Sequence, residues 1–406
     1  MRRTHLALLA VLCLVCQARA GDWPQWLGPQ RDGVSSETGL AAWPRQGPKR
    51  LWLRDVGSGF SGPVCAGDRL IIFHRLGDKE VVECLSPATG KKHWDFRYAT
   101  AFDDSFGKGD GPRSTPVIHG KRVITLGAEG TLHCLDLEKG EKIWERRLQR
   151  DYKIPASYFG VGTSPMVDND LVLINVGGKD AGIVAFALAD GKEVWKATSD
   201  QASYSSPVVG TIGTSRQAVF FTRTGVVILD PATGKVGYQK RWRARIDASV
   251  NAATPLVIGD LAFFSASYDT GALLLKLRPD GADEVWQGEE IMSNHYNTCV
   301  HQRGYLYGFD GRQEAGPSLR CVELKTGKVQ WTKERFGCGG MIAVDGQLLM
   351  LLESGDLILA EASPQAYREK ARARILEGPP CRAQIALSEG RLFARDQGKL
   401  GCWELK

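Results

Sequence analysis

One eleven-residue pattern recurs along the chain and constrains the fold more than any other feature of the sequence. A small or apolar pair begins the pattern, a glycine-containing turn follows, and a tryptophan ends it. Three copies align without gaps, at residues 84–94, 134–144 and 185–195, and looser copies begin near residues 228, 275, 321, 360 and 402. An interval of about 40 to 50 residues is the period of a four-stranded propeller blade. The sequence therefore predicts an all-β, eight-bladed β-propeller of four-stranded antiparallel blades.

Each part of the repeat has a structural reason. The glycine allows the tight turn after the third strand of a blade, and the tryptophan then begins the fourth, outer strand. An indole buries a large apolar area, so we expect the recurring rings to lie flat on the neighbouring blades and hold the ring together. The rings concerned are Trp94, Trp144, Trp195 and Trp331, with Tyr238 in the same place in another copy. The copy near residue 360 is degenerate and predicts a short helical insert around Tyr367.

The two ends of the chain complement each other. Residues 51–56 have the character of an outer strand, yet no inner strands precede them. Residues 400–405 form a strand of a last repeat, and no outer strand follows it. Pairing the two segments would complete one blade and remove two exposed sheet edges. We therefore expect the N- and C-terminal strands to close the propeller within one blade.

The first twenty residues are typical of a secretory signal peptide. Arg2 and Arg3 form a basic start, an apolar run follows, and residues 18–20 have the small-x-small form of a cleavage site. We expect residues 1–20 to be removed and residues 21–406 to form one propeller domain. No later stretch approaches the about 18 apolar residues of a transmembrane helix. We therefore expect an exported protein, periplasmic or associated with the cell envelope and soluble after cleavage.

Charge and cysteine content narrow the function further. The formal charge of the whole chain is +6, and three of the basic residues lie in the leader, so a nucleic-acid partner is not indicated. Eight cysteines remain beyond the leader, and an even number in an exported chain suggests disulfides. Four of them, Cys84, Cys134, Cys321 and Cys402, occupy one repeat position that faces a core, which favours buried free thiols. We expect a monomer.

A binding site is expected on one face of the ring. The loops before the first strands and the loops between the second and third strands open on the same face, and they are polar and aromatic here. Convergent polar groups at a channel mouth are the usual place for a ligand, although such groups also serve to satisfy loop backbone and hold water. The candidates for a cofactor or ligand at this mouth are Arg113, Tyr204, Asn251 and His295. We expect Asp110 to form a local ion pair with Arg113.

The docking repeat resembles that of the PQQ-repeat, quinoprotein alcohol dehydrogenase-like β-propeller superfamily. The opening segment Asp22 to Gly33 resembles the start of exported PQQ-like propellers, which are often described as similar to BamB, the propeller subunit of the outer-membrane assembly machinery. The resemblance covers about residues 22 to 406. It implies two branches, one of quinoprotein dehydrogenases and one of noncatalytic, BamB-like partner-binding proteins.

The two branches predict different sites. In the dehydrogenase branch, the resemblance implies PQQ over the channel, a tryptophan floor, a disulfide between adjacent cysteines, Ca²⁺ held by Glu and Asn, and an Asp base. The sequence has no adjacent cysteine pair, and no Glu, Asn and Asp set matches by motif. The BamB-like branch implies a lipid anchor, but no lipobox precedes Cys16.

The favoured hypothesis is an exported, noncatalytic binding or scaffold propeller, which holds no cofactor and presents its loop face to an envelope protein or small ligand. The alternative is a PQQ- and Ca²⁺-dependent dehydrogenase acting on alcohols or sugars. A hydrolase or lyase activity is a third hypothesis. His295 could act as a general base, but a lone histidine in a loop of serine, asparagine and tyrosine is more often a hydrogen-bonding structural residue.

Overall fold

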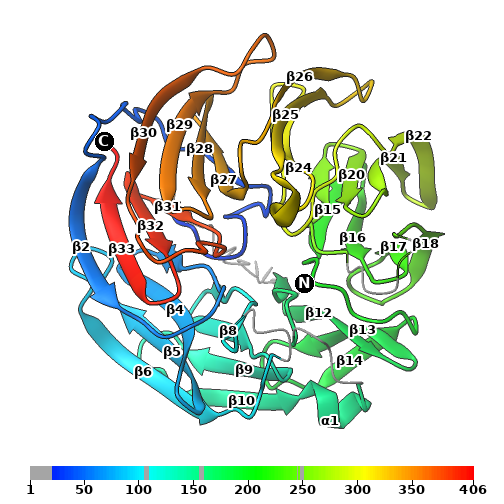
Figure 1. Cartoon of the computed structure of the whole chain (residues 1–406). Helices are drawn as coiled ribbons and strands as arrows, with labels where there is room; N and C mark the ends of the chain where they lie inside the picture. The colour runs from blue at the N-terminus through cyan, green and yellow to red at the C-terminus, as the bar shows by residue number, and fades with distance from the viewer. Residues whose placement is uncertain (1–20, 105–108, 155–159, 245, 247–250) are drawn as a thin grey trace, which may run out of the picture.

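The computed structural model describes residues 21–104, 109–154, 160–244, 246 and 251–406, and forms a closed ring of eight sheets. Figure 1 looks along the central channel, with the first strand of each blade near the axis and the fourth strand at the rim. Seven sheets have four antiparallel strands, and one has a fifth, short strand added at its inner edge. The predicted eight-bladed propeller is confirmed. The predicted signal peptide, residues 1–20, lies outside the described residues.

The blades follow one another in chain order, and their inner to outer strands have these bounds. Blades 1 to 4 comprise β3 (Val64–Ala66), β4 (Arg69–Leu76), β5 (Lys79–Leu85), β6 (Lys92–Ala99); β7 (Val117–His119), β8 (Arg122–Leu126), β9 (Thr131–Asp136), β10 (Lys142–Arg147); β11 (Met166–Asp168), β12 (Leu171–Gly178), β13 (Ala181–Ala187), β14 (Glu193–Ala197); and β15 (Val208–Ile212), β16 (Ser215–Phe221), β17 (Gly225–Leu229), β18 (Val236–Arg241). Blades 5 to 8 comprise β19 (Leu256–Ile258), β20 (Leu261–Ala266), β21 (Gly271–Arg278), β22 (Gly281–Gly288); β23 (Val300–Gln302), β24 (Tyr305–Asp310), β25 (Ser318–Glu323), β26 (Val329–Lys333); β27 (Gly339–Val344), β28 (Gln347–Leu352), β29 (Asp356–Glu361), β30 (Glu369–Arg374); and β31 (Ala386–Ser388), β32 (Arg391–Arg395), β33 (Lys399–Glu404), β2 (Lys49–Asp55).

The remaining elements are short. Strand β1 (Val34–Ser35) adds to the inner edge of blade 7, helix α1 (Leu148–Tyr152) follows blade 2, and a 3₁₀ turn spans Gln313–Ala315. Among the described residues, no helix has the length and apolar character needed to cross a membrane.

The recurring tryptophans join neighbouring blades as predicted. Trp144 of blade 2 is 8% exposed, and its Nε1 donates to Leu188 O of blade 3 at 3.0 Å. Its ring lies on Gly191, where an added Cβ would come within 2.7 Å of the indole. Gly191 also has a positive φ of 70°, so both the close approach of the indole and the backbone conformation favour glycine at this turn. The same donor–carbonyl contact is made by Trp94, Trp195, Trp286 and Trp331.

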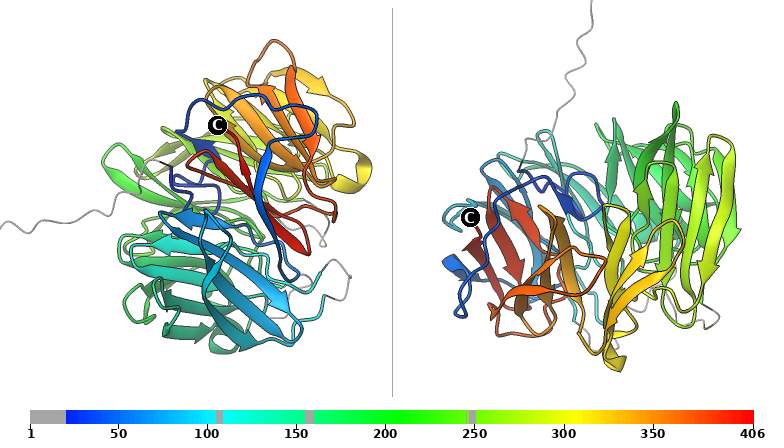
Figure 2. Two further views of the ribbon diagram at one scale, coloured as in Figure 1. Left: turned by 90° about the vertical axis from the view of Figure 1, so that its left-hand side faces the viewer. Right: turned by 90° about the horizontal axis from the view of Figure 1, so that it is seen from above.

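Closure of the ring uses both ends of the chain, as expected. Strand β2 pairs antiparallel with β33, from Lys49 opposite Glu404 to Asp55 opposite Lys399, and Figures 1 and 2 show the two strands side by side. Trp52 of β2 then donates to Pro87 O of blade 1 at 2.9 Å, which continues the docking series across the junction. The first and last segments of the propeller therefore form one blade and also fasten it to the next.

A belt of hydroxyl groups explains the small residue that precedes several of the first strands. The Thr115 Oγ1 accepts the Gly62 N–H at 3.1 Å, and the Ser164 Oγ accepts the Thr115 N–H at 2.9 Å. The Ser206 Oγ in turn accepts the Ser164 N–H at 2.9 Å. Each hydroxyl thus satisfies a buried amide of the preceding blade close to the channel.

Apolar cores lie between adjacent blades, and the cysteines belong to them. Cys84, for example, packs in one cluster with Trp94 of its own blade and Val123 of the next blade. All eight cysteines of the described residues are buried, and none forms a disulfide. The prediction of buried free thiols is confirmed for this structure.

The short helical insert predicted around Tyr367 is wrong. Residues 362–368 form an irregular loop between β29 and β30. Ser363 O accepts the Trp331 Nε1–H at 2.9 Å, and the Tyr367 ring lies 6.2 Å from that of Trp331. Pro364 follows directly and cannot donate a helical hydrogen bond. Docking of the tryptophan therefore fixes an extended connection here.

The N-terminal segment, residues 21–35, fills the central channel and is called the plug below. Its backbone pairs with β3 through reciprocal 2.8 Å bonds between Trp23 and Cys65, and β1 runs parallel to β27. Figure 1 shows this dark blue segment crossing the middle of the ring. Arg31, 1% exposed, donates to Pro165 O at 2.8 Å. The plug therefore bonds to inner strands on several sides of the ring.

Candidate functional site

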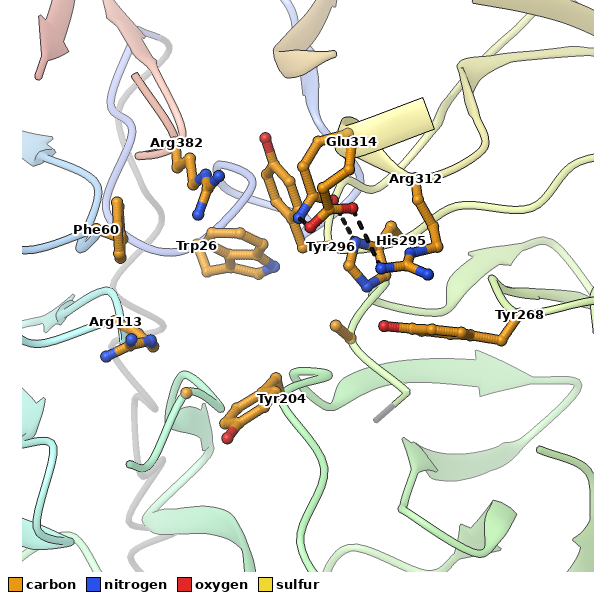
Figure 3. Close-up of a pocket in the computed structure, with 13 residues that line it drawn as sticks. Trp26, Phe60, Arg113, Tyr204, Tyr268, His295, Tyr296, Arg312, Glu314 and Arg382 are labelled. Carbon is orange, nitrogen blue, oxygen red and sulfur yellow. Dashed lines mark hydrogen bonds and ion pairs between the residues drawn. The ribbon is translucent and has the colours of Figure 1, made fainter. Parts of the chain in front are cut away.

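A pocket of about 360 Å³ opens at one mouth of the channel, on the face formed by the loops before the first strands and the loops between second and third strands. This face is called the loop face. Figure 3 shows Trp26 of the plug at the centre of the pocket. Its Nε1 donates to Thr254 Oγ1 at 2.8 Å, which fixes the indole at the end of the channel. The plug therefore both blocks the channel and supplies the floor of the pocket.

One wall of the pocket combines two arginines with an aromatic ring. The guanidinium of Arg113 lies 5.5 Å from the centre of the Phe60 ring, and that of Arg382 lies 5.7 Å from the same ring. The Arg113 Nη2 pairs with Asp104 Oδ2 at 3.0 Å, and burial lowers the pKa of Arg113. The three side chains come from the loops that precede blades 1, 2 and 8, so closure of the ring assembles this wall.

Arg382 is held by a second group of residues, which are buried or half-buried. Its Nε donates to Glu353 Oε1 at 2.7 Å, and the Tyr296 hydroxyl donates to the same carboxylate oxygen. The Cys338 Sγ lies 3.5 Å from the Tyr296 hydroxyl. Burial lowers the pKa of Arg382, but the adjacent Glu353 outweighs this effect and the net pKa is raised. The guanidinium is therefore a fixed cation beside the pocket floor.

The opposite wall is built by blades 5 and 6. The guanidinium of Arg312 stacks on the Tyr268 ring at 4.5 Å and pairs with Glu314 at 3.4 Å. The His295 ring meets Tyr268 edge-on at 5.4 Å, and its Nδ1–H donates to Gln313 Oε1. Burial lowers the pKa of His295, so the imidazole is neutral at pH 7. The histidine is thereby positioned as part of an aromatic wall.

Three of the four predicted site residues line this pocket, namely Arg113, Tyr204 and His295. The Asn251 side chain lies elsewhere: it is 1% exposed and donates to Thr222 O at 2.7 Å, which anchors the loop before blade 5. The neighbouring Ala252 lines the pocket instead.

The predicted ion pair between Asp110 and Arg113 is replaced by that between Asp104 and Arg113. Asp110 Oδ1 accepts the backbone N–H of Asp104 at 2.9 Å, so it orients the true partner. Residues 155–159, in the loop before blade 3, lie outside the described residues.

Sequence reasoning missed two residues that define the pocket. Trp26 lies in the opening segment Asp22 to Gly33, and a non-repeating segment gives no indication that it enters the channel. Tyr268 lies in a four-residue turn without glycine, although its φ is 59° and that of Asp269 is 58°. Only the geometry of the turn shows that its tyrosine faces the mouth.

The residues at the mouth do not fit the PQQ and Ca²⁺ arrangement implied by the dehydrogenase branch. The carboxylates of Asp104, Glu314 and Glu353 each pair with an arginine. Among the described residues, no group of three His, Cys, Asp or Glu side chains is arranged to hold a metal ion. The nearby Asn251 and Asn294 amides donate to backbone carbonyls. The described residues of this mouth therefore do not form a carboxylate and amide cradle.

Together, the fold and the pocket define a tryptophan-docked, eight-bladed propeller with a plugged channel and an aromatic, arginine-rich mouth. Residues 77–333, more than half of the chain, match the family described as outer membrane protein assembly factor BamB. The chain therefore belongs to this family.

A curated relative supports the same family. BamB of Burkholderia pseudomallei (strain K96243) is 29% identical over 247 residues, which cover 56% of this chain and 57% of the relative. The chain is thus matched to little more than half the length of that protein.

Similar solved structures include a BamB and a quinohemoprotein alcohol dehydrogenase. BamB from Moraxella catarrhalis has a TM-score of 0.64 at 14% identity, over 88% of this chain and 99% of that chain. Quinohemoprotein alcohol dehydrogenase from Comamonas testosteroni has a TM-score of 0.68 at 14% identity, over 95% and 81%. At such identity these likenesses establish the fold alone.

Proposed function

We propose that the protein is a noncatalytic binding propeller of the cell envelope, which contributes to outer-membrane protein assembly by holding a partner protein at its loop face. Membership of the BamB family supports this class of function. The observation that carries the proposal is the mouth pocket, in which the charged groups are locked in ion pairs on an aromatic floor and walls. Such a pocket favours recognition over chemistry.

Fixed arginines suit recognition because little conformational entropy is lost when a partner contacts them. Arg382 is oriented by Glu353, and Arg312 by Tyr268 and Glu314. Aromatic and arginine side chains are also the residues that most often dominate the energy of protein interfaces. The plug adds rigidity, since Trp26 is bonded to Thr254 across the channel.

The partner-binding face is tested by site-specific photo-cross-linking in cells that make the protein natively. A photoreactive amino acid replaces Asp103, which is exposed on the loop face, or Glu141, which is exposed on the opposite face. The proposal expects a discrete adduct with an envelope protein from position 103 and none from position 141. Equal labelling from both faces, or a discrete adduct from position 141 alone, would refute it.

The absence of catalysis is tested separately with the purified protein, PQQ and Ca²⁺. The proposal expects no stoichiometric retention of PQQ after gel filtration and no alcohol- or sugar-dependent reduction of a dye. Retention of the cofactor with turnover would establish the dehydrogenase alternative.

A further inference from the structure

The mouth pocket is the inner end of a longer groove across the loop face. A second hollow of about 580 Å³ shares Tyr268 and Arg312 with the mouth pocket. A third hollow of about 260 Å³ shares Asp269 and Glu289 with the second. The stacked side chains of Arg312 and Tyr268 thus lie at the boundary between the mouth pocket and the outer hollows. Trp242 lines the third hollow and supplies an aromatic surface there.

The charge of the groove changes along its length. The mouth pocket is lined by the guanidinium groups of Arg113 and Arg382, whose carboxylate partners Asp104 and Glu353 are not among its lining residues. The middle hollow is lined by the carboxylates of Asp269, Glu289 and Glu290. Within the described part of the chain, no lysine, arginine or histidine is recorded as an ion-pair partner of these three carboxylates. All three residues are exposed. Arg312 and Arg320 also line the middle hollow, but they pair with Glu314 and Asp310, so the described lining of this hollow is net acidic.

The β20–β21 turn, which lies between the mouth pocket and the outer hollows, has an unfavourable backbone conformation for its side chains. Tyr268 and Asp269 occupy the centre of the β20–β21 turn, and both have positive φ, as in a type I′ turn. Asn-Gly is strongly favoured at such a position, and a bulky residue with positive φ is strained there. Tyrosine faces the mouth pocket and aspartate lines both outer hollows. The turn therefore keeps Tyr268 and Asp269 although their backbone conformation favours Asn-Gly, and it presents both side chains to the groove.

We propose that the groove binds an extended polypeptide segment of the partner, with basic side chains over the Asp269–Glu290 hollow and an acidic and aromatic portion in the mouth. This inference rests on the proposed function and specifies the chemistry of the partner. Charge complementarity selects the occupant, because arginine groups line the mouth and exposed carboxylates line the middle hollow, which favours opposite charges in a fixed order along the segment. A linear segment can follow three adjoining hollows, whereas a compact ligand would fill one.

The inference is tested by fluorescence anisotropy with a labelled peptide of about ten residues, long enough when extended to cross several hollows. It carries two lysines, a glycine–serine spacer and a glutamate–tyrosine–glutamate end. A second peptide of the same composition alternates lysine and glutamate. We expect the ordered peptide to bind at least about fivefold more tightly than the alternating one at low salt, and the difference to vanish near 1 M salt. Equal affinities at low salt would overturn the inference.

Two variants locate the binding. Glu289→Gln with Glu290→Gln is expected to weaken binding of the ordered peptide about three- to tenfold, since each exposed charge contributes modestly. The matched control, Glu141→Gln with Asp170→Asn, removes two exposed carboxylates on the opposite face and should leave affinity unchanged. Equal weakening by both double variants would indicate general charge attraction and overturn the groove.

The turn offers a variant that does not weaken the fold. Tyr268→Asn with Asp269→Gly restores the favoured type I′ sequence, so thermal stability should stay equal or rise while peptide affinity falls at least about fivefold. Unchanged affinity would contradict the inference. If the ordered peptide fails to bind while cross-linking at position 103 still captures a partner, the groove hypothesis fails and the proposed function stands. If the cross-link is also absent, the proposed function itself fails.

Discussion

Docking of Trp144 on blade 3 can be tested by removing the indole. Trp144→Ala deletes a ring that is 8% exposed and bonded to Leu188 O at 3.0 Å. Truncation of a buried tryptophan costs about 3–5 kcal/mol, so the free energy of unfolding should fall by that amount. Trp144→Phe keeps most of the apolar contact and loses the donor, which should cost about 1–2 kcal/mol. Urea denaturation followed by circular dichroism measures both values.

The adjacent residue provides the control. Ile143 lies on the same strand and is 44% exposed, so Ile143→Ala should change stability by about 0.5 kcal/mol or less. A double-mutant cycle adds a stricter test, because a Cβ at position 191 would meet the Trp144 ring at 2.7 Å. Gly191→Ala should therefore cost less in the Trp144→Ala background than alone, with a coupling of about 0.5–3 kcal/mol. Additive effects, or equal costs for Trp144→Ala and Ile143→Ala, would refute inter-blade docking.

Three further predictions follow from buried polar groups. Thr115→Val removes the acceptor of the Gly62 N–H at 3.1 Å and should destabilise by about 1–3 kcal/mol, whereas Thr115→Ser should be nearly neutral in the same urea assay. Burial lowers the pKa of His133 to about 4, so the unfolded chain takes up a proton first as pH falls. Stability should therefore fall by about 3 kcal/mol from pH 6.5 to 4, and His133→Gln should abolish that part of the slope measured by denaturation at each pH. Burial raises the pKa of the Cys84 thiol to about 12, so Cys84 should resist a thiol reagent at pH 8 until the protein is unfolded; rapid labelling of this residue in the native protein would contradict its placement.

The sequence was sufficient for the ring because its determinants are local and repeated. A tryptophan at a fixed distance from a turn glycine predicts docking, and complementary end strands predict closure; Trp52 and its contact with Pro87 bear out both. The loop face could be predicted because the strands of a blade alternate in direction, so two sets of loops open on the same face. Arg113, Tyr204 and His295 lie in these loops, and all three line the mouth pocket.

The remaining features depend on contacts that no repeat encodes. The plug reaches its partners across the whole chain, as in the bond between Trp26 and Thr254, so its position could not be inferred from spacing. The prediction of Asn251 as a pocket residue was wrong because its buried side-chain amide donates to the Thr222 carbonyl. Local proximity also misled the pairing of Arg113, since Asp104 reaches the guanidinium and Asp110 supports the loop.

We propose above that the loop face, with the plugged mouth at its centre, holds the partner. A structure of the cross-linked complex tests this most directly. We expect a segment of the partner to occupy the mouth pocket above Trp26 and to contact Arg382 and Arg312. A partner bound to the opposite face or the outer strands, with the mouth left open to solvent, would contradict it.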